Sequence, residues 1–233
     1  MDDDRWCFSW IEGEGSDTHG KSRAALVRQY MWAPGDTIWV GWQENDPADT
    51  PLRNKVKKYA SGWTAPKLAN LTIAFTDNAD DADVRISFRS RGSWSVLGTT
   101  CREIPRERPT MNFGWLRTAN DEEARRVVLH EFGHALGLIH EHQNPGGTIP
   151  WNKEQVYRDL SGPPNSWDKA TIDRNMFQPY DKNETNFTNV DPKSIMMYPI
   201  PAKWVTDPKY VAGSNSDLSQ NDRDFIARQY PSG

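Results

Sequence analysis

A cluster of histidines in the middle of the chain most constrains its fold. Four of the five histidines lie between residues 130 and 142 of the 233 residues. His130 and His134 are four residues apart, so on a helix they lie one turn apart on the same face. They can therefore aim two imidazole nitrogens at one point. Glu131 follows the first histidine and lies beside that point without being needed as a ligand.

A third metal ligand has to come from beyond this helix. Gly137 can end the helix in the left-handed conformation and turn the chain back, which lets His140 reach the same ion. Three neutral nitrogens leave a fourth position for water, which is the arrangement of catalytic zinc. Zinc lowers the pKa of such a water to roughly 7, and Glu131 can then take its proton. The spacing predicts one catalytic Zn²⁺ and hydrolysis of amide bonds, with His142 outside the ligand set.

Composition excludes several other classes of protein. The 28 Lys and Arg residues against 32 Asp and Glu give a net charge of -4, which offers nothing for nucleic acid to bind. No apolar run approaches the ~18 residues that a membrane helix needs. The 11 Trp, 7 Tyr and 8 Phe residues supply ample material for a core, so a disordered chain is not expected. The scattered tryptophans are interpreted as core residues.

Periodicity and turn signals divide the chain into two parts behind an extension. Five strands and three helices are expected: strands over 37–42, 71–75, 84–88, 94–98 and 110–115, and helices over 51–61, 120–137 and 218–230. Residues 30–137 are thus a strand-rich upper subdomain with two long helices. Residues 138–233 form an irregular lower subdomain that ends in a helix, with the zinc cleft between the two. Residues 1–29 show no clear period and are interpreted as an irregular extension.

Two sequence motifs together resemble those of a known peptidase clan. The pattern H-E-x-x-H-x-x-G-x-x-H over residues 130–140, followed by Ser194-Ile195-Met196-Met197-Tyr198, is similar to the metzincin zinc peptidases. Glu141 directly after the third histidine, and Tyr198 in the methionine turn, make the chain resemble the astacin branch. The chain departs from astacins in having Met197 where they usually have histidine, and two cysteines where they usually have four.

The resemblance implies a fold and a role for each matching residue. It implies an α+β, metzincin-like fold with a twisted, mixed, five-stranded sheet. It implies that His130, His134 and His140 bind zinc and that Glu131 is the general base and later the acid. It also implies that Met196 lies beneath the site. Tyr198 would be a zinc ligand in the resting enzyme and would swing away to stabilise the oxyanion.

The strand over 94–98 resembles the sheet edge to which metzincins bind the substrate backbone. Residues 1–29 precede the expected catalytic domain of 30–233 and could act as a pro-segment over the cleft. Their candidate zinc ligands are the thiolate of Cys7 and the carboxylates of Asp2, Asp3, Asp4 and Asp17. Two alternatives remain open: a structural disulfide between Cys7 and Cys101, and packing of the segment on the domain surface.

These features predict a monomeric zinc metalloendopeptidase that acts on protein or peptide substrates. Such an enzyme suits a secreted or extracellular location. The acidic start, Met1 to Arg5, is not a secretory signal, so a trimmed chain or another export route is expected. The alternatives are a catalytically silent binding module on the same scaffold, which would have lost the glutamate or a ligand, and a peptidase delivered into another cell as a toxin or effector.

Overall fold

The computed structural model describes residues 7–10, 30–163, 165–179 and 189–232. Its sheet has six strands in the order β1-β5-β6-β4-β2-β3. These strands are β1 (Cys7–Trp10), β2 (Thr37–Trp42), β3 (Thr72–Phe75), β4 (Val84–Ser87), β5 (Ser93–Val96) and β6 (Met111–Phe113). The helices are α2 (Thr50–Ala60), α3 (Asp121–Ala135), α4 (Lys153–Leu160), α5 (Lys169–Ile172) and α6 (Gln220–Gln229).

The sheet is mixed, because β5 and β6 are antiparallel and all other neighbouring strands are parallel. Its strands β2 to β6 confirm the predicted mixed sheet of five strands. The sixth strand, β1, comes from the N-terminal extension and pairs with β5. The expectation that the extension is irregular is therefore wrong for residues 7–10. A strand of four residues without clear alternation cannot be recognised from its own sequence. It forms here because the edge strand β5 offers unpaired backbone groups.

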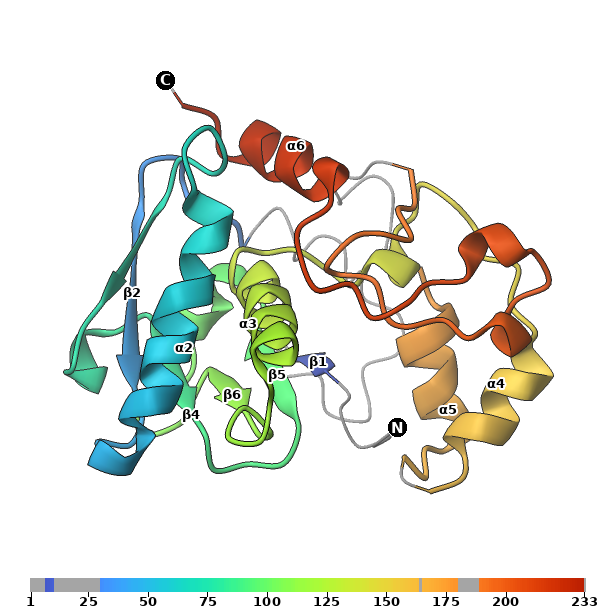
Figure 1. Ribbon diagram of the computed structural model, residues 1–233, viewed down its shortest axis with the longest axis horizontal. Coiled ribbons are helices and arrows are strands. Elements are labelled where there is room, and N and C mark those ends of the chain that lie inside the picture. The colour runs from blue at the N-terminus through green and yellow to red at the C-terminus, as the bar shows by residue number, and fades with distance from the viewer. Residues whose placement is uncertain (1–6, 11–29, 164, 180–188, 233) are drawn as a thin grey trace.

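Helix α3 begins and ends at the predicted signals. The Asn120 side chain accepts a hydrogen bond of 2.9 Å from the Glu123 backbone N–H, which caps the first turn. Gly137 lies just beyond the last turn with φ of 93°, a conformation that glycine adopts at no steric cost. Helices α2 and α3 pack against each other beside the sheet, and α4 and α5 lie on the other side of α3 from β2 and α2 (Figure 1).

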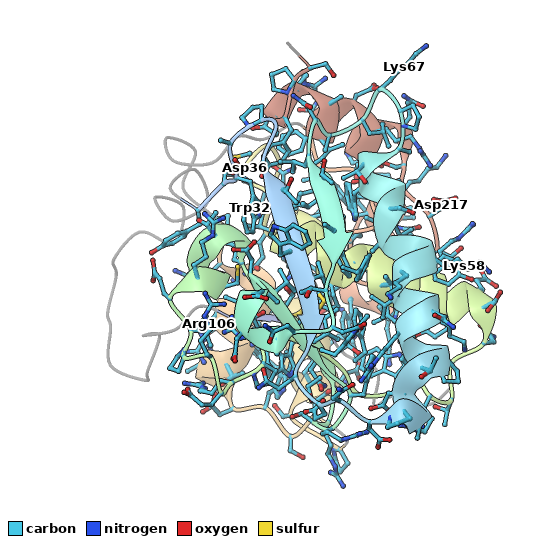
Figure 2. The ribbon with its side chains drawn as sticks, turned by 90° about the vertical axis from the view of Figure 1, so that its left-hand side faces the viewer. Trp32, Asp36, Lys58, Lys67, Arg106 and Asp217 are labelled. Carbon is cyan, nitrogen blue, oxygen red and sulfur yellow. The ribbon has the colours of Figure 1, made fainter. Side chains whose placement is uncertain are left out.

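Two buried tryptophans anchor α3, as the core assignment predicted, whereas that assignment is wrong for Trp39, which is 45% exposed. The Trp32 and Trp63 indole N–H groups each donate a hydrogen bond of 2.8 Å to a carbonyl of this helix, those of Ala135 and Leu129. A buried indole N–H needs such a partner, so both rings fix where the helix lies. In Figure 2, Trp32 lies within the outline of the fold, whereas Lys58 extends from α2 into solvent.

The lower subdomain is irregular, with short helices between long loops. A π-helical turn over Asp173–Phe177 follows α5 directly. The closing helix α6 lies within the predicted range of 218–230 and begins at a capping box formed by Ser219 and Asp222. The Tyr230 hydroxyl donates a hydrogen bond of 2.6 Å to the Leu136 carbonyl, so the end of the chain is fastened to the end of α3. No helix in the described ranges is long and apolar enough to cross a membrane.

The turn that leads into β5 is held by the neighbouring strand. The Asn112 amide of β6 donates hydrogen bonds to the carbonyls of Ser90 (3.0 Å) and Gly92 (2.6 Å), and its oxygen accepts one from the Ser90 N–H. The Gly114 N–H donates to the same Gly92 carbonyl at 2.9 Å. Backbone therefore approaches backbone closely here, and the position of β5 depends on it.

Gly114→Ala is expected to destabilise this hairpin. A Cβ at this position would lie 2.5 Å from the Gly92 carbonyl oxygen and 2.6 Å from that of Ser90, so the backbone would have to move. Overpacking of this kind typically costs about 1–3 kcal/mol. Gly213→Ala is the matched control, because nothing lies within 4 Å of a Cβ there. Thermal unfolding should show a lower Tm for the first variant only. Equal Tm values would contradict this account of the hairpin.

Candidate metal centre

The three predicted histidine ligands lie together in the core. His130 and His134 come from α3, and His140 comes from the segment that turns back after Gly137. One ring nitrogen from each residue lies within 4.8 Å of the other two, and all three side chains are buried. Among the described residues, no other group of histidine, cysteine or carboxylate side chains meets so closely.

Hydrogen bonds fix which nitrogen of two rings carries the hydrogen. His130 Nδ1 bonds the Ile195 carbonyl and His134 Nδ1 bonds the Leu138 carbonyl, both at 2.8 Å. A carbonyl only accepts, so both hydrogens are on Nδ1 and each Nε2 presents a lone pair. This is the arrangement that orients imidazole ligands around a metal ion.

The Nε2 atoms of the three rings face one another at a spacing that fits a zinc ion. The Nε2 atoms of His134 and His140 lie 3.1 Å apart, and His130 Nε2 has no hydrogen-bond partner. Ligand nitrogens at 2.0–2.1 Å around tetrahedral zinc lie about 3.3 Å apart. Burial lowers the pKa of the His130 and His140 imidazoles well below the usual range, and that of His134 to about 4. The rings are thus neutral at physiological pH, as ligands must be.

His140 reaches the cluster through the turn at Gly137. The Leu138 N–H bonds back to the Gly133 carbonyl at 2.9 Å, which closes the helix end. The Glu141 N–H donates at 2.9 Å to the Met196 carbonyl, which ties the segment after His140 to the methionine turn. The predicted route of the third ligand is therefore observed.

The methionine turn, Ser194 to Tyr198, supports the histidines from below. Its Ile195 carbonyl accepts from His130, and its Met196 side chain packs against Gly133, where a Cβ would collide with the thioether. Asp222 of α6 accepts hydrogen bonds from the Ser194 hydroxyl at 2.7 Å and from the Ile195 N–H at 2.8 Å. The sequence placed Asp222 in the closing helix but gave no signal for this contact.

Two further acidic side chains lie near the cluster. Glu131 is fully buried on α3, directly after the first histidine. Glu141 is partly buried, and its carboxylate accepts hydrogen bonds from the Asn144 amide (2.9 Å) and the Asp191 N–H (2.8 Å). Burial nonetheless raises the pKa of Glu141 to about 8. Glu141 and Asp222 both line a small pocket of about 50 Å³ beside Ser194 and Met196 of the methionine turn.

Tyr198 lies against the third histidine. Its ring centroid is 4.3 Å from that of His140 and 6.4 Å from that of His130. The His142 ring is also stacked on Tyr198, with 4.6 Å between the two ring centroids. His142 is outside the ligand group, as predicted, and burial lowers its pKa to about 4. The structure thus brings the three histidines and Tyr198 together, with Glu131 next to His130 on α3.

The predicted substrate edge, β5, is covered by the extension. Strand β1 pairs with it in parallel, with Cys7 opposite Ser93 and Trp10 opposite Val96. The Cys7 side chain and residues Asp2, Asp3, Asp4 and Asp17 lie outside what the structure describes. Cys101 is a buried free thiol, and burial raises its pKa to about 12, so a structural disulfide with Cys7 is not formed.

Comparisons with known proteins place this site in a family. No protein-family model matches the chain, and neither does any curated protein. Two solved structures of myroilysin are similar to it. The first is 42% identical with a TM-score of 0.82, over 89% of this chain and 98% of that one. The second is 36% identical with a TM-score of 0.67, over 99% of this chain and 93% of that one.

These likenesses confirm the resemblance drawn from the motifs, both in the metzincin-like α+β fold and in the histidine cluster. Identity above 40% across nearly the whole of a solved structure exceeds what a shared fold alone requires. The chain therefore belongs to the myroilysin family of zinc metallopeptidases.

Proposed function

We propose that this protein is an astacin-like endopeptidase that cleaves internal bonds of protein substrates. His130, His134 and His140 hold one Zn²⁺. The observation that carries the proposal is the convergence of three neutral, buried imidazoles, two of them with their lone pairs fixed by carbonyls on the opposite nitrogen. When bound, zinc polarises the substrate carbonyl and lowers the pKa of the attacking water.

Glu131 moves the proton in this reaction. It follows the first ligand on α3 and is outside the ligand group, so its carboxylate would act as a base beside a bound ion. It accepts the proton of the attacking water and then delivers it to the leaving amine. Its complete burial excludes bulk water from this transfer.

Tyr198 stabilises the negative charge that develops on the substrate oxygen. A phenol remains protonated at neutral pH and can donate a hydrogen bond to that oxygen. Its ring contact with His140, at 4.3 Å between centroids, supports this role and that of a zinc ligand in the resting enzyme. The residue thus alternates between binding the metal and binding the oxyanion.

The other functions considered are less well supported. A silent binding module would have lost the glutamate or a ligand, and this chain retains Glu131 and all three histidines. A delivered effector peptidase would use the same chemistry on other substrates. We place the enzyme outside the cell that makes it, where it cannot digest its own cell's proteins.

The extension keeps the enzyme latent. Strand addition at a sheet edge is a general mode of peptide binding, and β5 is the edge that the substrate backbone would use. Because β1 already pairs with all four residues of β5, the same backbone groups are not available to a substrate. Removal of residues 1–29 would expose this edge.

His134→Ala is expected to lose the metal. Two remaining imidazoles make a poor zinc site, and the ring's second contact, to the Leu138 carbonyl, is lost as well. Elemental analysis of the purified protein should find one zinc per wild-type chain and far less than one per variant chain. A variant that keeps a full equivalent of zinc would show that the ligand set is wrong.

Glu131→Gln is expected to keep the zinc and the fold while losing turnover. The amide has the shape of the carboxylate but cannot accept the proton, and general-base catalysis is typically worth ~10²–10⁴-fold. The control is Glu122→Gln, an exposed glutamate one helix turn or more from the site. Peptide cleavage and zinc content should be measured for both. Wild-type cleavage by the Glu131 variant would rule out the mechanism.

The latency of the extension can be tested on a single peptide substrate. A chain that begins at Tyr30 should cleave it several-fold faster than the full chain, because β5 is then open. This truncation keeps the Tyr30 carbonyl, which accepts a hydrogen bond from the Thr99 N–H. Cys7→Ala in the full chain separates a thiolate effect from strand pairing. Equal or lower activity in both would contradict latency.

A further inference from the structure

His142 lies in the active-site region with no role in the proposed chemistry. It belongs to a short 3-10 turn, Glu141–Gln143, directly after the third histidine. Its side chain is only 5% exposed, although a histidine that neither binds metal nor moves protons is costly to bury. An explanation has to come from its contacts.

Two of these contacts are with the rings of the site. The His142 ring is stacked on Tyr198 at 4.6 Å between centroids and 25° between planes. It is also stacked near His140, at 5.4 Å and 25°. Since Tyr198 contacts His140 at 4.3 Å as well, the three rings form one packed group. The tyrosine ring is thus held by contacts with a predicted ligand, His140, and with a residue outside the ligand group, His142.

A third contact holds His142 itself in place. Its Nε2 lies 2.7 Å from the Asn175 carbonyl, which only accepts, so the hydrogen is on Nε2. Nδ1 is buried and has no hydrogen-bond partner. The ring is therefore fixed by one hydrogen bond, and its remaining contribution is through its faces and edges. Trp151 packs edge-on against it at 6.3 Å.

The carbonyl that fixes His142 belongs to the π-helical turn over Asp173–Phe177. In this turn the Gln178 N–H bonds the Asp173 carbonyl, one residue further back than in an α-helix. Two side chains of the 3-10 turn donate hydrogen bonds to carbonyls at the end of the π-helical turn. His142 donates to the Asn175 carbonyl, and Gln143 donates to those of Arg174 and Gln178 at 3.0 and 3.2 Å. The lower subdomain thereby sets the orientation of His142.

We infer that His142 is a positioning residue for Tyr198: its ring face, stacked on the tyrosine, keeps the phenol where it can serve both the metal and the oxyanion. The inference rests on the proposed role of Tyr198. Without the stacked ring, the tyrosine would spend part of its time in other rotamers, and the transition state would lose its hydrogen bond. Because substrate contacts at β5 are elsewhere, kcat should fall while KM stays unchanged.

Two variants separate the ring face from the hydrogen bond. His142→Gln can still donate to the Asn175 carbonyl but presents no ring, and it should lower kcat roughly 2- to 10-fold, the range of a stacked aromatic pair. His142→Phe keeps the ring but cannot donate, and it should stay within about twofold of wild type. Tyr157→Phe is the matched control, since it removes the hydrogen bond that the Tyr157 hydroxyl donates to Asp173 of the same turn and keeps the ring. All variants should retain zinc by elemental analysis and a cooperative unfolding transition.

A double-mutant cycle with Tyr198→Phe tests whether His142 acts through the tyrosine. The double variant His142→Gln with Tyr198→Phe should have the kcat of Tyr198→Phe alone. If the His142→Gln loss persists in full in that background, or if His142→Phe is as impaired as His142→Gln, the inference is overturned. If the Gln variant does not fold, His142→Asn, which also presents no ring, takes its place in the cycle. An unchanged kcat in Tyr198→Phe would instead refute the role of the tyrosine in the proposed function.

Discussion

The structure depends on placing three uncharged imidazoles around one point in a dry interior. Burial keeps the His130, His134 and His140 rings neutral, and neutral nitrogens pointing at each other repel unless a cation lies between them. Helix α3 sets two of these rings by its period alone. The turn at Gly137 and the Met196 carbonyl hold the third, so much of the surrounding packing serves to fix a geometry that only a metal ion makes favourable.

The support beneath the rings links the end of the chain to the site. Asp222 caps α6 and also accepts the Ile195 N–H, while the carbonyl of that same residue accepts from His130. Ile195 of the methionine turn therefore contacts both the cap of α6, through its N–H, and a candidate metal ligand, through its carbonyl. Burial raises the pKa of Asp222, yet three hydrogen bonds favour its charged form, so this carboxylate is held where an apolar residue could not replace it.

Local spacing was sufficient to predict the site, because its main residues lie within one helix and the turn that follows it. The same holds for the ends of α3 and α6, where Asn120 and Ser219 are caps whose partners are three residues away. The pairing of β1 with β5, and the contact of His142 with the π-helical turn, could not be predicted. Each joins segments 33 or more residues apart, and neither partner carries a periodic signal for the other.

The pairing of β1 has a consequence for how such an enzyme can be switched on. On the proposed function, β1 competes with substrate as part of the same chain, and such an intramolecular competitor acts at a high effective concentration. Substrate at ordinary concentrations competes poorly with it, and dilution has no effect on an intramolecular contact. Parallel pairing over four residues gives few hydrogen bonds, so the segment opens locally rather than with the whole fold. A segment that opens in this way is open to cleavage, and cutting the tether converts a favourable intramolecular contact into a weak intermolecular one. On the proposed function, proteolysis of the extension is therefore a more effective switch than substrate accumulation.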